Sequence, residues 1–296
     1  MHEEEIIILI LLGISQRISI PSNKYFLNFL LAVQSYTQIP LTLSENKTIS
    51  IVIPAYNEER RIRPVLSEIC NYIKSNELPW NVIISIDGND STDLVVESMK
   101  TDYPFLYYIK NSGRNGKGGA IKRAVNIASG EFIILMDADN AVTFGSIVSE
   151  LNWSDEYKFI NFDRYKRKEN RIPLLRRFVS RGYNLYVKSL LGLDINDTQC
   201  GYKIIEKSLA IQLFNKITIT NGFFYSPLFF YVKNMGISVL EVPVRYNHSD
   251  GSKFKVSSMI LGGFLSTLFF RIRNSPFNKF IPKKLISIYY KKFRWI

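Results

Sequence analysis

Residues 49–59 read ISIVIPAYNEE, and this stretch decides the fold. Its first six residues form a largely β-branched run that predicts a buried strand, and residues 58–74 then follow the spacing of an amphipathic helix. The same alternation of apolar runs and helix-like segments continues through 82–86, 93–100, 105–109, 118–128 and 132–136. Strands that alternate with helices predict an α/β fold, in which helices on both faces cover a mostly parallel sheet.

Carboxylates follow two of the predicted strands. Asp137 and Asp139 come directly after the run 132–136, and Asp87 follows the run 82–86. Ligands of such sheets bind beyond the carboxyl ends of the strands, where these side chains would meet. Carboxylate oxygens suit Mg²⁺ or Mn²⁺, and such an ion clamps a diphosphate, so Asp137 and Asp139 are the predicted metal ligands. A turn carboxylate that caps the next helix is the alternative for this pair.

The turn at Asp87 and a glycine-rich loop add candidates for a nucleotide site. Asp87 is placed to accept a hydrogen bond from a base N–H. The loop at 111–119 brings glycines and Lys117 to the start of a predicted helix, an arrangement that can cradle phosphate. It is not a Walker A sequence, and a plain flexible loop is its alternative. The polar stretch at 197–203 predicts only a loop from its composition.

The side chains available for catalysis are few. His2 and His248 are the only histidines, which leaves almost no material for a histidine metal cage or a Ser/His/Asp triad. Cys70 and Cys200 are too few for a secreted disulfide scaffold and lack the spacing of a zinc site, which favours a reducing, cytosolic compartment. Catalysis is therefore expected to rely on carboxylates, backbone groups and cations.

Positive charge is concentrated in two segments. The net charge is +12, residues 253–296 hold ten Lys and Arg but no Asp or Glu, and a second basic cluster occupies 164–181. Basic residues interleaved with aromatic ones favour an anionic membrane surface over nucleic acid, and a solvated tail is the alternative. The apolar stretch 256–270 would span roughly 22 Å as a helix, short of a hydrocarbon core of about 30 Å. We expect peripheral or monotopic association with the cytoplasmic face of a membrane.

Several motifs together resemble those of family 2 glycosyltransferases of the GT-A fold. They are residues 53–59, 87–88, 116–119, 137–139, Arg164, 197–203 and 250–253. The resemblance covers roughly 48–255 and is nearest to the dolichyl-phosphate glucosyltransferases, with dolichyl-phosphate mannose synthases as near relatives. It implies a GT-A domain at 47–255, between a hydrophobic arm of unassigned role at 1–46 and a basic, amphipathic, membrane-associating tail at 256–296.

The resemblance also implies roles for individual residues. The expected donor-binding residues are Pro54, Tyr56, Glu58, Asp87, Lys117 and Asp137. The expected catalytic residues are Asp137, Asp139 and Asp197. The expected acceptor-phosphate residues are Arg164, Arg176 and Ser180, since guanidinium groups bind phosphate well, although a solvated basic helix face is the alternative around Arg176.

The implied reaction is an inverting hexosyl transfer from a nucleotide sugar to polyprenyl (dolichyl) phosphate, with UDP-glucose as the first choice of donor and GDP-mannose as the second. One departure is Phe224-Tyr-Ser-Pro227, where relatives show Phe-Asp-x-Glu, so Tyr225 and Pro227 replace two expected carboxylates. Two rivals remain: a family 2 enzyme that modifies a glycan, glycolipid or protein, and a non-catalytic membrane or nucleic-acid-binding protein that retains the fold.

Overall fold

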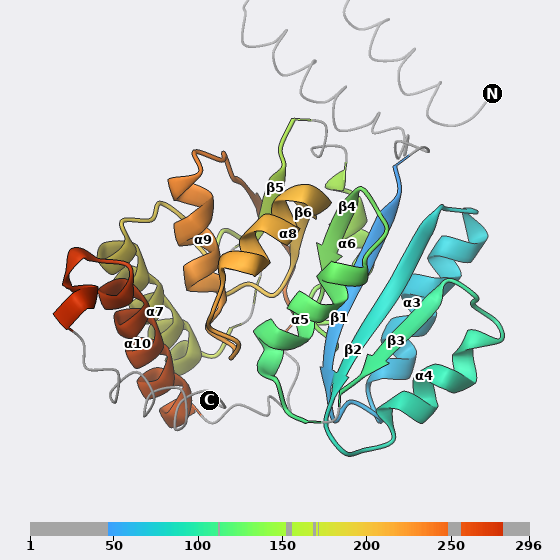
Figure 1. Ribbon diagram of the computed structural model, residues 1–296. Coiled ribbons are helices and arrows are strands. Elements are labelled where there is room, and N and C mark those ends of the chain that lie inside the picture. The colour runs from blue at the N-terminus through green and yellow to red at the C-terminus, as the bar shows by residue number, and fades with distance from the viewer. Residues whose placement is uncertain are drawn as a thin grey trace, which may run out of the picture. The chain divides into compact units, whose positions relative to one another are not determined.

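The computed structural model describes residues 47–111, 113–151, 156–167, 170, 172–247 and 256–280 (Figure 1). The predicted N-terminal arm at 1–46 lies outside the described residues. So do residues 248–255, which hold the end of the predicted catalytic domain, and residues 281–296 of the predicted basic tail.

Within the described residues, seven strands form one sheet in the order β3-β2-β1-β4-β6-β5-β7. They are β1 (Ile49–Tyr56), β2 (Trp80–Asp87), β3 (Leu106–Lys110), β4 (Phe132–Leu135), β5 (Phe159–Asp163), β6 (Lys203–Glu206) and β7 (Leu240–Pro243). Strand β6 runs antiparallel to β4 and β5, and all other neighbours are parallel. The predicted mostly parallel sheet is confirmed.

Helices cover the sheet, as predicted. They are α3 (Ile62–Ser75), α4 (Thr92–Lys100), α5 (Gly116–Ile127), α6 (Phe144–Val148), α7 (Leu174–Leu191), α8 (Lys207–Lys216), α9 (Tyr225–Asn234), α10 (Val256–Arg273) and the 3₁₀ helix η2 (Pro276–Phe280). Helix α3 begins four residues later than the predicted 58, because Asn57 takes a left-handed φ of 56° and Glu58 O accepts the N–H groups of Arg61 and Ile62 in a turn.

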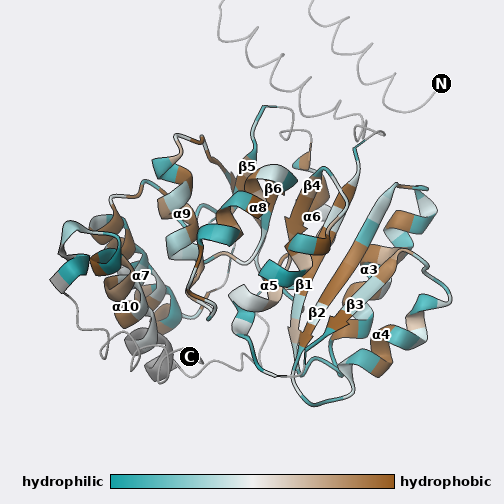
Figure 2. Ribbon diagram, viewed as in Figure 1, coloured by the Kyte–Doolittle hydropathy of each residue, from teal (hydrophilic) through white to brown (hydrophobic). Residues whose placement is uncertain are grey.

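The two faces of the sheet have separate apolar contacts. Val52 of β1 and its register partner Ile83 of β2 belong to the buried cluster that includes Ile121 and Val125 of α5. Successive strand residues point to opposite faces, so the fully buried Ile51 faces the other side. Helices α5 and α8 pack on the first face, and right-handed crossovers place α3 and α4 on the second (Figure 1). Figure 2 shows that β1 and β2 are largely hydrophobic along their length, as strands covered on both faces should be.

Helices α7 and α10 pack against each other beside this sheet (Figure 1). Tyr183 of α7 hydrogen-bonds Thr267 of α10 at 2.8 Å, and Phe270 of α10 joins the main hydrophobic cluster. The amphipathic membrane role predicted for 256–296 is therefore not confirmed by α10, which buries residues within the protein. Over the described part of the chain, we find no helix that combines the length and apolar character needed to cross a bilayer.

The strand order reverses between β1 and β4. From β1 the chain moves outward through β2 to β3, and then returns to place β4 on the other side of β1. A bond of 3.0 Å from Met136 N to Val52 O extends this pairing past the end of β4, so Asp137 emerges beside the end of β1. This is the position at which α/β sheets bind ligands.

Candidate active site

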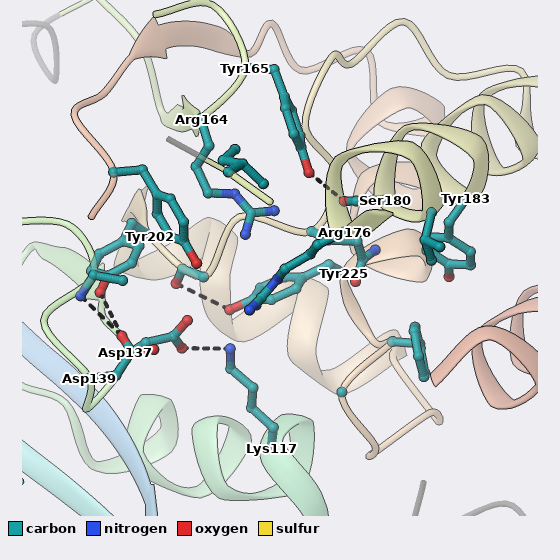
Figure 3. Close-up of a pocket in the computed structure, with 18 residues that line it drawn as sticks. Lys117, Asp137, Asp139, Arg164, Tyr165, Arg176, Ser180, Tyr183, Tyr202 and Tyr225 are labelled. Atoms are coloured by element: carbon teal, nitrogen blue, oxygen red, sulfur yellow. Dashed lines mark hydrogen bonds and ion pairs between the residues drawn. The ribbon is translucent and has the colours of Figure 1, made fainter. Parts of the chain in front are cut away.

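Two cavities meet at the reversal point, and Lys117, Asp137 and Asp139 line both of them. The first cavity, of about 450 Å³, is also lined by Pro54, Ala55, Tyr56, Glu58, Arg61, Asp87, Arg114, Gly116, Ala120 and Ala138. The second cavity, of about 270 Å³, is drawn in Figure 3 and also contains Arg164, Arg176, Ser180, Tyr202, Tyr225 and Tyr246. Every predicted donor residue lines the first cavity, and every predicted acceptor residue lines the second.

Asp87 ends β2 and is 3% exposed. Its Oδ1 accepts hydrogen bonds from Asn111 Nδ2 at 2.5 Å and Arg123 Nη2 at 3.0 Å, and its Oδ2 accepts the N–H groups of Asn115 at 2.7 Å and Gly116 at 3.1 Å. These four bonds fix the glycine-rich loop against β2. The carboxylate thus already has four hydrogen-bond partners within the chain. Its predicted contact with a nucleobase stays a prediction.

The glycines of the loop pack closely against Thr220 and Phe224, and the predicted phosphate cradle stays a prediction. The N–H groups of Gly118 and Gly119 donate to Thr220 O at 2.8 and 3.2 Å, so these first-turn donors of α5 are occupied. A side chain at Gly116 would lie 2.6 Å from Thr220 O, and one at Gly118 would lie 2.8 Å from the Phe224 ring. The loop's contribution to the cavities is Lys117, whose Nζ forms an ion pair of 2.5 Å with Asp137 Oδ1.

Asp137 and Asp139 follow β4 and remain partly exposed to the cavities. Oδ1 of Asp139 accepts Ala141 N at 3.1 Å and Tyr202 OH at 3.3 Å, while its Oδ2 accepts no hydrogen bond from the described residues. Any side chain at Gly201 would collide with the Asp137 carboxylate, so the glycine leaves room for that group. Both carboxylates thus present oxygens to the cavities.

These two aspartates fit Mg²⁺ or Mn²⁺ as the predicted metal. The described residues contain no group of three or more His, Cys, Asp or Glu side chains that could hold an ion. An ion at this site would rest on Asp137 and Asp139 and complete its coordination with water and substrate oxygens. Mg²⁺ binds in this manner in phosphate-transfer sites, where one or two carboxylates and the substrate phosphates hold it.

Arg164 and Asp197 form a buried ion pair, and the role predicted for each stays a prediction. Asp197 Oδ2 accepts Arg164 Nε at 2.7 Å, Oδ1 accepts Nη2 at 2.9 Å, and the side chains are 2% and 13% exposed respectively. Asp197 lines neither cavity, so the catalytic role predicted for it has no geometric support. It holds Arg164 at the cavity wall, which leaves Arg164 with less capacity for a phosphate than a guanidinium without a carboxylate partner.

Arg176 and Ser180 lie four residues apart on α7, and both line the second cavity. One helix therefore brings both side chains to the same cavity, whereas the phosphate contact stays a prediction. Figure 3 shows the Arg176 side chain extending from α7 into the cavity, while Tyr165 OH donates to Ser180 Oγ. Ile172, Val179 and Phe223 add an apolar portion to the same cavity.

Tyr225 stands at the first position where the resemblance led us to expect a carboxylate. It begins α9, is 1% exposed and lines the second cavity. The buried Lys203 lies over its ring and donates to Asn161 Oδ1 at 2.8 Å and Cys200 O at 2.7 Å. Burial lowers the pKa of Lys203 to about 8, and burial also raises the pKa of the Cys200 thiol to about 11, which makes that thiol a poor nucleophile.

Sequence reasoning missed several residues that line the cavities. Arg114 stacks its guanidinium 4.6 Å from the centroid of the Tyr56 ring in the first cavity. Gln199, Gly201 and Tyr202 line the second cavity. The available signal was the dense polar motif at 197–203, but its composition does not show which of its side chains face a cavity and which face the core.

Comparisons with known proteins agree with this geometry. Residues 50–214 match the family model described as glycosyl transferase family 2. A dolichyl-phosphate beta-glucosyltransferase of Trichomonas vaginalis is 31% identical, over 72% of this chain and 69% of that protein, and the mouse protein of that name is 28% identical over 71% and 70%. The Mycobacterium tuberculosis glucosyl-3-phosphoglycerate synthase, solved with Mn²⁺, UDP-glucose and glycerol 3-phosphate, aligns with a TM-score of 0.56 at 16% identity, over 76% of this chain and 80% of that chain. That likeness concerns the fold.

Proposed function

Because the chain belongs to glycosyl transferase family 2, we propose that this glycosyltransferase moves glucose from UDP-glucose to the phosphate of a polyprenyl lipid such as dolichyl phosphate. The observation that carries the proposal is the meeting of the two cavities at Lys117, Asp137 and Asp139. One cavity can hold a nucleotide sugar and the other a phosphorylated acceptor. The names of the curated relatives support this choice of donor and acceptor.

The donor is expected to lie in the first cavity with its diphosphate toward the junction. Tyr56 and Glu58 line this cavity alone and are the expected contacts of the nucleoside, whereas Lys117 lines both cavities and so lies at their junction. A Mg²⁺ or Mn²⁺ ion bound by Asp137 and Asp139 would neutralise charge on the departing diphosphate. Lys117 adds a fixed positive charge at the same point, where it favours departure of the UDP group.

The acceptor phosphate is expected to lie in the second cavity, where Arg176 and Arg164 provide positive charge. A phosphate monoester is already ionised at neutral pH, so its oxygen can attack the anomeric carbon without a strong general base. In-line attack on the face opposite the departing UDP inverts the configuration at that carbon. This chemistry suits a site that has cations and carboxylates but, among its described residues, no histidine.

A lipid acceptor agrees with the outer face of α7. Leu174, Phe178 and Leu185 are 66–83% exposed and lie four and seven residues apart, on one side of the helix that carries Arg176 and Ser180. We propose that this apolar stripe faces the bilayer while the phosphate enters the cavity on the other side of the helix. The basic segment at 256–296 would add attraction to anionic lipids on the cytoplasmic face, next to a catalytic domain at 47–255.

The test is transfer by the full-length protein in the presence of Mn²⁺, with lipid products identified by mass spectrometry. Dolichyl phosphate would be incubated with UDP-glucose and, separately, with GDP-mannose. We expect a hexosyl dolichyl phosphate from UDP-glucose. A product formed with GDP-mannose but not with UDP-glucose would overturn the proposed donor. Transfer to soluble glycans but not to dolichyl phosphate would overturn the proposed acceptor. The absence of nucleotide-sugar turnover with all acceptors would favour a non-catalytic protein.

A further inference from the structure

The ring of Tyr225 contacts two ammonium groups where the cavities meet. Nζ of Lys117 lies 5.3 Å from the ring centroid, and Nζ of Lys203 lies 4.3 Å from it. The phenol hydroxyl donates to Gly201 O at 3.2 Å, as Figure 3 shows by the dashed line at Tyr225. Because the side chain is 1% exposed and bonded at its tip, the ring has a fixed position beside both cations.

Lys117 needs a contact other than its ion pair to hold its position. Among the described residues Asp137 is its one ion-pair partner, and that carboxylate is 28% exposed and is a predicted ligand of the metal. An aromatic ring attracts an ammonium group through its quadrupole but carries no net charge. The ring of Tyr225 can therefore hold Lys117 without neutralising it, so the positive charge stays available to a phosphate group.

The charges of the second cavity are consistent with this role. Its lining contains three cations, Lys117, Arg164 and Arg176, and two carboxylates, Asp137 and Asp139. Asp197 pairs with Arg164 behind the cavity wall, so three carboxylates already match these three cations. A carboxylate at position 225 would add a further negative charge, whereas tyrosine adds none. Both proposed substrates carry phosphate groups, and a residue without negative charge at the junction does not add to their mutual repulsion.

We propose that Tyr225 is a positioning residue that holds the Lys117 ammonium at the junction of the cavities for contact with the diphosphate of the donor. This inference rests on the proposed function, because it assumes a nucleoside diphosphate in the first cavity. Tyr225 acts through Lys117, so the effects of changing the two residues should not add.

The experiment measures binding of UDP and of uridine to the full-length protein by calorimetry in the presence of Mn²⁺. Tyr225→Leu should weaken UDP binding by roughly tenfold, the scale of a desolvated cation–π contact, and should leave uridine binding unchanged. Tyr225→Phe keeps the ring but loses the hydroxyl, which also contacts Lys117, so its UDP binding should lie between that of the wild type and that of Tyr225→Leu. In a Lys117→Met background, Tyr225→Leu should cause no further loss.

Tyr231→Leu is the matched control, since Tyr231 also lies on α9 and its ring contacts Lys216 away from both cavities. It should leave UDP binding unchanged. Equal weakening of uridine and UDP by Tyr225→Leu would indicate general distortion and overturn the inference. Additive losses in the double variant, or unchanged UDP binding by Tyr225→Leu, would overturn it as well. If the wild type itself does not bind UDP, the proposed donor is wrong and the inference falls with it.

Discussion

At the scale of single residues, the junction of the cavities combines opposite charges at short range. Lys117 contacts Asp137, while Asp139 keeps Oδ2 without a hydrogen bond from the described residues. The two aspartates therefore differ: Asp137 already has a cation, and Asp139 has an oxygen available to one. Substitutions at these positions should affect chemistry more than folding.

Asp139→Asn should lower the rate of glucosyl transfer by roughly 100-fold or more, comparable to losing one preorganised electrostatic contact in an enzyme. The fold should survive, because an asparagine Oδ1 can still accept the bonds from Ala141 N and Tyr202 OH. Transfer assays and thermal unfolding would check both points. Asp194→Asn, at a fully exposed carboxylate, is the control. Full activity of the wild type in excess EDTA would contradict a metal at this site.

The buried pair of Arg164 and Asp197 should be important for stability. Asp197→Ala leaves a buried guanidinium without its carboxylate, so the free energy of unfolding should fall by about 3–5 kcal/mol. Glu97→Ala breaks an ion pair with Lys100 whose side chains are 53% and 39% exposed, and it should cost at most about 1 kcal/mol. Urea denaturation of both variants would measure the difference. If both variants lose a similar amount of unfolding free energy, the buried pair contributes no more to stability than the exposed pair.

At the scale of elements, α7 presents different groups to different surroundings. Arg176 and Ser180 face the second cavity, Tyr183 and Val187 are buried, and Phe178 is exposed. An 18-residue helix thus connects the core, the candidate phosphate site and the outer surface. This arrangement allows the acceptor site to be tested separately from the donor site.

Arg176→Ala should raise the KM for dolichyl phosphate by roughly tenfold or more, the scale of a hydrogen bond to a charged group. UDP binding should be unchanged, and Arg176→Lys should rescue only in part, because an ammonium lacks the planar fork of a guanidinium. Steady-state kinetics with varied acceptor would measure the effect. Arg177→Ala is the control, since Arg177 is the adjacent arginine and lines neither cavity. Equal loss of donor and acceptor binding would argue for misfolding.

Much of the element pattern was predictable from the sequence, because β-branched runs and helical spacing are local signals. The run at 49–54 and the run before the carboxylates at 137 and 139 correspond to β1 and β4, whereas the reversal point between them is seen only in the sheet order. Strand β6 was not among the predicted strands. Its four residues pair antiparallel with β4 and β5. A strand so short has too few residues to show a period.

The contacts of the site that sequence reasoning did not foresee involve partners distant in the chain. Asp197 pairs with a guanidinium 33 residues away, which local composition cannot show. The loop glycines were read as a phosphate cradle, but their N–H groups donate to Thr220 O, about a hundred residues further on. Motif resemblance identified the residues that gather at the cavities, and tertiary contacts decided what each of them touches.

At the scale of the whole molecule, charge and exposed apolar groups provide a basis for association with a bilayer. The net charge is +12, and the apolar stripe of α7 (Leu174, Phe178 and Leu185) lies on the helix that lines the acceptor cavity. A lipid acceptor has to present its phosphate while its prenyl chain stays in an apolar medium. Membrane binding and acceptor access should therefore depend on the same helix.

The triple variant Leu174→Ser, Phe178→Ser and Leu185→Ser should sediment with anionic liposomes at least about tenfold less well than the wild type, because burial of each such side chain contributes about 1.5–3 kcal/mol. UDP binding should be retained. Serine at the exposed apolar residues Leu94, Tyr107 and Ile127, which lie on other elements, provides a matched triple control. Unchanged sedimentation of the α7 variant would show that the stripe does not face lipid.

The close approach of Gly201 to Asp137 limits what can occupy position 201. The loop 197–203 carries the partner of Arg164 at one end, and near its middle it lies so close to the Asp137 carboxylate that no side chain fits between them. Even a methyl group at position 201 would therefore have to displace either the loop or the carboxylate that lines both cavities.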